Sequence, residues 1–282
     1  MRLLVAAVQL NSADDKAANI AAAEAGISRA AELGARLVVL PELWTYLGPA
    51  AANRQNAEPI PGPVSELLAT LAQRYELVLH GGSILELPEG SPGEARPYNT
   101  ALLFGPDGRL LTTYRKVHLF DATPDETAAP YRESETIARG DAIVTVEVEG
   151  LKLGLATCYD LRFPELFRAL ALRGAEILLL PAAFTLETGR DHWEPLIRAR
   201  AIENGCYMVA AGQVGSFPPR RMTYGRSMIV DPWGTILAQA PDEPTVVISE
   251  IDLDRVGDVR HRIPSLANRR ADIYGDLRVE TR

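Results

Sequence analysis

The chain has 282 residues, 47% of them hydrophobic and 23% charged, with a formal net charge of −8. This length is enough for a full hydrophobic core, while the negative charge argues against nucleic acid or an anionic membrane as the main partner. No apolar stretch has the length of a membrane-spanning helix, and two cysteines make no disulfide framework, which favours a reducing cytoplasm.

The first half of the chain alternates between short runs rich in Leu and β-branched residues and Ala-rich stretches. This alternation is typical of an α/β protein. We expect strands at residues 3–10, 36–40, 77–83, 100–104 and 110–114, and helices at residues 15–33 and 64–75. For the first helix, Asp14 is the predicted N-cap and Gly34 the predicted C′ residue.

The second half repeats this arrangement and ends in a different kind of segment. We expect helices at residues 165–173 and 193–204, and strands at residues 143–148, 151–156, 176–180, 207–211, 228–230, 235–238 and 245–251. Two β-rich halves, each with a pair of helices, predict two packed sheets with helices outside them. Because no linker separates the halves, we expect a single domain over residues 1–282, with the Arg- and Pro-rich residues 263–282 forming a C-terminal arm.

Cys158 stands where an apolar run ends and a predicted helix is about to begin. A thiol between the end of a strand and the start of a helix occupies a position where thiolates are stabilised and where open α/β sheets carry their sites. The alternative is a small buried hydrophobic residue, which is the common role of a free cysteine. The residues that surround Cys158, and two distant residues, favour the first interpretation.

The two distant residues are Glu42 and Lys116, which also follow predicted strands. A carboxylate directly after a buried strand is costly unless it is paired or protonated, although Glu42 could instead be a solvated loop residue. Lys116 could likewise simply face solvent. Together, however, the three residue types form a nucleophile, a base and a cation. A thiolate attacks a carbonyl carbon, a carboxylate takes the thiol proton and later activates water, and an ammonium lowers the pKa of the thiol. The ammonium and the backbone N–H of Tyr159 are the expected oxyanion donors.

Three segments resemble, in order, the signatures of the nitrilase superfamily of carbon–nitrogen hydrolases. They are Pro41-Glu42, the segment from Tyr114 to Asp121 around Lys116, and the segment from Cys158 to Glu165. The resemblance continues over nearly the whole chain. It implies an αββα four-layer sandwich, a homodimer or larger assembly, no cofactor or metal, and a catalytic triad of Glu42, Lys116 and Cys158. The second active-site glutamate of the family falls on Glu133, with Glu135 as its near neighbour.

Within the superfamily the chain is most similar to the Nit branch, which includes ω-amidase and deaminated glutathione amidase. The resemblance implies hydrolysis of a primary amide of a small carboxylate-bearing substrate, giving an acid and ammonia through a cysteine thioester. Thr157 before the cysteine, and Arg226 where many Nit proteins carry histidine, leave the substrate open. The alternatives are an N-carbamoyl amino acid hydrolase, a nitrilase and, in another class, a non-catalytic binding or scaffold protein with this fold.

Four further residues are candidates for substrate binding. Arg162 could anchor a substrate carboxylate or pair with Glu165, and His192 could orient the site or be purely structural. Phe184 and Thr185 follow a strand end and either line the pocket or pack in a loop. We expect the loops at residues 43–57, 122–130 and 217–223 to set specificity. Four scattered histidines show no metal-ligand spacing.

Overall fold

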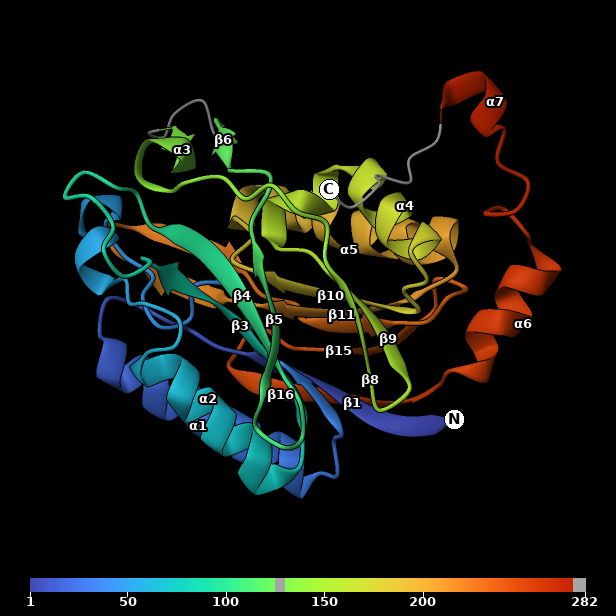
Figure 1. Cartoon of the computed structure of the whole chain (residues 1–282), viewed down its shortest axis with the longest axis horizontal. Helices are drawn as coiled ribbons and strands as arrows, with labels where there is room; N and C mark the ends of the chain where they lie inside the picture. Colours follow the sequence, from blue (N-terminus) through green and yellow to red (C-terminus); the bar gives the residue numbers. More distant parts are fainter. Residues whose placement is uncertain (125–129, 276–282) are drawn as a thin grey trace.

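Two six-stranded sheets pack face to face at the centre of the molecule (Figure 1). The computed structural model describes residues 1–124 and 130–275. The first sheet has the order β16 (Thr245–Asp252), β1 (Arg2–Gln9), β2 (Leu37–Val39), β3 (Val78–Glu86), β4 (Tyr98–Phe104) and β5 (Leu110–Arg115). The second has the order β15 (Ile236–Gln239), β14 (Met228–Val230), β11 (Tyr207–Gly212), β10 (Ile177–Ala182), β9 (Leu151–Leu155) and β8 (Thr145–Val148). The predicted α/β fold is confirmed.

Four helices form the outer layers of the sandwich. Helices α1 (Lys16–Glu32) and α2 (Pro63–Tyr75) bury Ile27 and Leu68 in one apolar cluster with Val38 of the first sheet. Helices α4 (Pro164–Leu172) and α5 (Leu186–Asn204) bury Leu170 and Ile197 in a second cluster with strands of the other sheet. The order of layers is therefore helix, sheet, sheet, helix, as the family resemblance implied.

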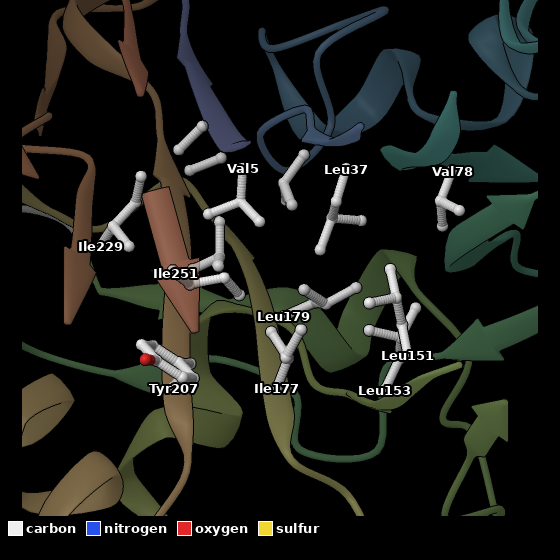
Figure 2. Packing of buried hydrophobic residues seen from close by; sticks show 14 of the residues in the cluster. Val5, Leu37, Val78, Leu151, Leu153, Ile177, Leu179, Tyr207, Ile229 and Ile251 are labelled. Carbon is white, nitrogen blue, oxygen red and sulfur yellow. The ribbon is translucent and has the colours of Figure 1, made fainter. Parts of the chain in front are cut away.

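The core between the sheets explains why so many strands read as continuous apolar runs. Val5 and Leu37 from the first sheet meet Ile177 and Leu179 from the second in this layer, as Figure 2 shows. Side chains alternate between the two faces of a strand, so Leu178, between two of these residues, packs against the helices instead. A strand that is buried on both faces needs apolar residues at every position.

Strand direction brings three strand ends to the same region. Strand β2 runs parallel to β1 and β3, and β5 has this same direction because β3, β4 and β5 are successively antiparallel. In the second sheet β9 runs parallel to β10. The segments that leave the carboxyl ends of β2, β5 and β9 carry Glu42, Lys116 and Cys158 respectively, and in an α/β fold this edge is where a site forms.

The structure differs from the predicted elements in several places. Helix α5 begins at Leu186 and not at residue 193. Gly189 lies in the part of α5 that was not predicted, and close packing requires glycine there, because a Cβ would lie 2.3 Å from the Cβ of Tyr224. The N-cap of α1 is Asp15 and not Asp14, since the Asp15 carboxylate accepts from the N–H of Ala18 at 3.0 Å. The hairpin of β12 (Val214–Phe217) and β13 (Arg221–Tyr224) and helix α6 (Asp254–Arg262) were not predicted.

Short elements complete the described chain. They are the 3-10 helices η1 (Ala50–Ala52), η2 (Arg54–Asn56) and η3 (Cys158–Arg162), strands β6 (Asp121–Ala122) and β7 (Tyr131–Arg132), and helices α3 (Glu133–Thr136) and α7 (Ala271–Tyr274). Helix α7, within the predicted arm, lies apart from the two sheets in Figure 1, while residues 276–282 of that arm are outside the described residues. Among the described residues, no helix combines the length and apolar character needed to cross a membrane.

Candidate active site

A bulge in β3 makes room for the turn that carries Glu42. The register of β3 and β4 shifts between His80 and Ser83, and Gly82 has a φ of +60°. A Cβ on Gly82 would lie only 2.1 Å from the carbonyl oxygen of Pro41, so this close approach requires glycine. The Ser83 hydroxyl then accepts from the N–H of Leu43 at 3.0 Å. The Gly81-Gly82 pair therefore positions the Glu42 turn.

Cys158 lies on a sharp turn between β9 and α4. Its φ of +47° is a left-handed conformation that costs a non-glycine residue roughly 1 kcal/mol, so the surrounding contacts must hold it. It is the first residue of η3, whose first internal hydrogen bond runs from the N–H of Asp160 to the carbonyl of Thr157 at 3.0 Å. The N–H of Tyr159 precedes this bond, so helix geometry leaves it without an intrahelical acceptor.

Asp160 ties the Cys158 turn to the segment that carries Lys116. This carboxylate is fully buried. Its Oδ2 atom accepts from the hydroxyl of Tyr114 at 2.7 Å, and its Oδ1 atom lies 2.7 Å from Nδ1 of His118 and 3.1 Å from the His118 backbone nitrogen. Since Tyr114 and His118 flank Lys116 in sequence, one buried carboxylate fixes the nucleophile segment and the lysine segment to each other.

Lys116 is held between two carboxylates. Its Nζ atom lies 2.8 Å from Oε1 of Glu42 and 2.9 Å from Oε2 of Glu133, and the Lys116 and Glu42 side chains are 2% and 3% exposed. The amide of Asn99 donates to Oε1 of Glu42 at 2.8 Å, and the N–H of Ala183 donates to Oε2 at 2.8 Å. The predicted residues Glu42, Lys116 and Glu133 thus form one buried hydrogen-bonded cluster.

The charges in this cluster set the protonation states. Burial alone lowers the pKa of Lys116, but the carboxylates of Glu133 and Glu42 outweigh it and hold this pKa well above its usual range, so Lys116 is an ammonium. Burial raises the pKa of Cys158 well above its usual range, and the Glu42 carboxylate raises it further, more than Lys116 lowers it. The expectation that Lys116 would give Cys158 a low pKa is therefore wrong. The group is therefore a neutral thiol, with the Glu42 side chain beside it.

Cys158 lines both a large cavity and a narrow recess beside it. The cavity has a volume of about 730 Å³, and Glu42, Lys116, Glu133 and Cys158 line its inner end. The recess, of about 10 Å³, adjoins the cavity and is lined by Arg162, Phe184, Thr185 and Thr188, together with Phe120, Tyr159 and Ala183.

The remaining predicted residues are distributed around these two spaces. Arg162 does not pair with Glu165; its guanidinium lies 5.0 Å from the ring centroid of Phe184 and 3.2 Å from Nδ1 of His192. His192 is exposed and lines neither space. Glu135 is also exposed, so Glu133 is the glutamate that contacts Lys116.

The predicted specificity loops are only partly described. The loops at residues 43–57 and 217–223 both contribute side chains to the cavity, whereas residues 125–129 of the loop at 122–130 lie outside the described residues. Among the residues that are described, no group of three or more His, Cys, Asp or Glu side chains could hold a metal ion.

Three functional groups escaped the sequence analysis. They are the amide of Asn99, the N–H of Ala183 and the carboxylate of Asp160. Asn99 does carry a signal, because it is a polar side chain near the start of an apolar strand, where an unpaired amide is costly. The Ala183 contact involves only backbone, so its side chain gives no indication of it.

The chain matches a known protein family over most of its length. Residues 4–261 match the carbon-nitrogen hydrolase family. The deaminated glutathione amidase of Synechocystis sp. is 44% identical over 269 residues, which cover 94% of this chain and 97% of that protein. The omega-amidase NIT2 of Homo sapiens is 39% identical over 271 residues, which cover 96% of each chain.

A solved structure supports the same relationship. The crystal structure of Saccharomyces cerevisiae Nit3, a member of branch 10 of the nitrilase superfamily, superimposes with a TM-score of 0.85 at 34% identity. The superposition covers 95% of this chain and 97% of the Nit3 chain. On the family match and these relatives, the protein is a hydrolase of carbon–nitrogen bonds other than peptide bonds, and the chain belongs to the carbon–nitrogen hydrolase family.

Proposed function

We propose that this amidase cleaves the amide of a small carboxylate-bearing substrate, either an ω-amide of a 2-oxo acid or deaminated glutathione, through a thioester on Cys158. The observation that carries the proposal is the buried cluster of Glu42, Lys116 and Glu133 around the thiol at the inner end of the cavity. A neutral thiol beside an ionised carboxylate and a fixed ammonium is suited to attack on an amide carbon.

The acylation half-reaction begins with proton transfer from Cys158 to Glu42. The sulfur forms a bond to the amide carbon, and the carbonyl electrons move onto oxygen. The Nζ atom of Lys116 donates to Oε1 of Glu42 at 2.8 Å and to both oxygens of Glu133, at 2.9 Å and 3.1 Å. An ammonium has three N–H donors, so the longer of the two Glu133 contacts would give way to the oxyanion. The N–H of Tyr159 is the second donor. When the intermediate collapses, Glu42 returns its proton to the leaving nitrogen, the carbon–nitrogen bond breaks, and a thioester remains.

The deacylation half-reaction repeats these roles with water. Glu42 takes a proton from water as the oxygen forms a bond to the thioester carbon, and the same two donors hold the oxyanion. Collapse breaks the carbon–sulfur bond, and Glu42 gives its proton to the departing sulfur, which restores the thiol and the carboxylate. Glu133 keeps Lys116 in place throughout, and its Oε2 atom is itself fixed by the N–H of Phe120 at 2.6 Å.

The acyl group would lie at the inner end of the cavity beside Cys158, with its carboxylate at the narrow recess, which at about 10 Å³ has room for about one water molecule and not for an acyl chain. Arg162, whose charge interacts with Cys158, would bind a carboxylate there, and burial lowers its pKa without removing its charge. His192 would orient Arg162 through the 3.2 Å contact. Phe184 and Thr185 would line the end of the acyl group that carries the carboxylate.

The two activities named for the relatives differ in the leaving group. An ω-amide of a 2-oxo acid releases ammonia. Deaminated glutathione is the 2-oxo acid amide of cysteinylglycine, so its scissile nitrogen leaves as a dipeptide. The expectation of a primary amide and ammonia therefore covers only the first of these substrates.

Assays on both amides, with N-carbamoyl amino acids and nitriles alongside, test the proposal. Cys158→Ala is expected to lower hydrolysis of the preferred amide at least about a thousandfold, because no nucleophile remains. Cys206→Ala is the matched control, since Cys206 is buried in the cluster between the second sheet and its helices. Mass spectrometry is expected to detect an acyl group on Cys158. Wild-type rates in Cys158→Ala, or no hydrolysis of either amide by the wild type, would overturn the proposal.

A further inference from the structure

The two spaces beside Cys158 are very unequal. The recess has a volume of only about 10 Å³, room for about one water molecule, so on the proposed function it takes no more than the acyl carboxylate beside Arg162. The acyl chain and the leaving group then both lie in the cavity of about 730 Å³. A departing ammonia needs about the room of one water molecule. The cavity is therefore larger than an acyl group and a departing ammonia require, which leaves room at its far end for a larger leaving group.

A row of aromatic rings leads from the nucleophile into this cavity. The ring of Tyr159 lies 4.9 Å from that of Phe120, centroid to centroid, and the ring of Phe120 lies 4.9 Å from that of Tyr131. The guanidinium of Arg221 lies 3.5 Å from the centroid of Tyr131 and ends the row.

Arg221 is held at a fixed position relative to Cys158. It is the first residue of β13 and pairs with Phe217 of β12. This hairpin is joined to the segment that follows β10, because the N–H of Tyr224 donates to the carbonyl of Phe184 at 2.9 Å and Thr223 forms a β-bridge with Thr185. The neighbouring N–H of Ala183 binds Glu42, so the hairpin and the catalytic base share one support.

We propose that Arg221 and Tyr131 form a subsite for the terminal carboxylate of a peptide-like leaving group. The inference rests on the proposed function and narrows it to an amide whose nitrogen belongs to a short peptide, such as the cysteinylglycine portion of deaminated glutathione. Arg221 presents a planar cation that matches a carboxylate, and the Tyr131 ring holds it in place. Burial raises the pKa of Tyr131 more than Arg221 lowers it, so its hydroxyl stays neutral and can donate a second hydrogen bond.

Arg132 also lines the cavity but is a poorer receptor. Its side chain is exposed, and its guanidinium already donates to the carbonyl of Tyr131 at 2.9 Å. An exposed cation in water contributes little to a carboxylate contact, whereas a half-buried one on an aromatic face contributes more. The subsite is therefore assigned to Arg221.

The experiment compares deaminated glutathione with its analogue whose glycine carboxyl is amidated. We expect the wild-type kcat/KM to be at least about tenfold higher for the substrate with the free carboxylate, because amidation removes a charge-assisted contact with Arg221. In Arg221→Gln this preference should disappear. Both rates come from the same sample, so a smaller folded fraction lowers them equally and leaves their ratio unchanged. Arg220→Gln, an exposed neighbour outside the cavity lining, is the charge-matched control and should keep the wild-type preference.

The other outcomes distinguish failure of the Arg221 subsite from failure of the proposed amidase function. A wild type without preference for the free carboxylate, or an Arg221→Gln variant that retains it, overturns the subsite. Hydrolysis of α-ketoglutaramate without hydrolysis of either peptide-like amide also overturns the subsite but leaves the proposed amidase function standing. If the wild type hydrolyses none of the three amides, the proposed function fails and the subsite fails with it.

Discussion

Asn99 and Glu42 are joined by a 2.8 Å hydrogen bond to Oε1, the same carboxylate oxygen that receives the Lys116 ammonium. Asn99 is fully buried, and its own Oδ1 atom has no hydrogen-bond partner among the described residues. The amide therefore fixes the proposed base without adding charge to the cluster. With Oε1 occupied in this way, Oε2 is left for the Ala183 N–H and the thiol.

Two substitutions of Asn99 separate geometry from charge. Asn99→Ala removes one donor and is expected to lower kcat by about tenfold, the effect of a lost buried hydrogen bond. Asn99→Asp adds a carboxylate within hydrogen-bond distance of Glu42, and like charges raise the pKa of a carboxyl group. The acid limb of the kcat–pH profile should therefore move to higher pH in Asn99→Asp and stay in place in Asn99→Ala. Profiles with the same acid limb in both variants would contradict this account.

Glu42→Gln is expected to change two properties of Cys158 in opposite directions. Amide turnover should fall by about 10²- to 10⁴-fold, because the proton acceptor is lost. Alkylation by iodoacetamide at pH 7 should become faster, since the carboxylate that raises the thiol pKa is gone while the Lys116 ammonium remains. Measuring both in a Cys206→Ala background leaves Cys158 as the single thiol. A parallel loss of alkylation and turnover would show instead that Glu42 activates the thiol for every electrophile.

Much of the site could be predicted because its residues follow strand ends. Glu42, Lys116 and Cys158 each come after an apolar run, and the resemblance supplied their order and the four layers. The protonation state of Cys158 was predicted wrongly for a physical reason. Its pKa is raised first by burial and then by the Glu42 carboxylate, and both effects exist only in the folded chain.

The missed elements have local sequences that conflict with their structure. The first turns of α5 were missed because Gly189 argues against a helix, yet α5 includes Gly189 where it packs against Tyr224 and tertiary packing outweighs propensity. The β12–β13 hairpin has only four residues in each strand and a proline-rich turn, so no period-2 pattern develops.

Gly82→Ala is expected to destabilise the protein and impair the site together. The added Cβ would meet the backbone of Pro41, and the positive φ of Gly82 is unfavourable for alanine. The free energy of unfolding should fall by about 1–3 kcal/mol or more, as judged by urea denaturation. Activity per folded molecule should fall as well, because Glu42 follows Pro41. Gly93→Ala is the control, since a Cβ there meets nothing within 4 Å. If the two variants lose the same stability and the same activity per folded molecule, the proposed role of the bulge is contradicted.

His80 should make the protein less stable in mild acid. Burial lowers its pKa from 6.5 to about 4, and neither ring nitrogen has a hydrogen-bond partner among the described residues. Between these two pH values the unfolded chain binds a proton that the folded chain does not, so stability is full above pH 6.5 and falls as the pH drops. By pH 4 the titration of His80 lowers the free energy of unfolding by about 3 kcal/mol in total.

Urea denaturation between pH 4.5 and 7 tests this linkage. In His80→Leu the free energy of unfolding should depend less steeply on pH than in the wild type, whatever its absolute value. His261→Gln removes an exposed histidine and should leave the wild-type slope. A His80→Leu slope equal to that of the wild type would mean that His80 is not the group responsible.

The pairing of β1 with β16 has a consequence for synthesis. Arg2 lies opposite Asp252, so the first strand to be made gains one of its two neighbours only near the end of translation. At about 5–20 residues per second, roughly 10 to 50 s separate the two strands. Throughout that interval β1 has an open edge, which is a template for pairing with another chain. The nascent protein is therefore most exposed to aggregation, and most dependent on chaperones, before residue 252 emerges.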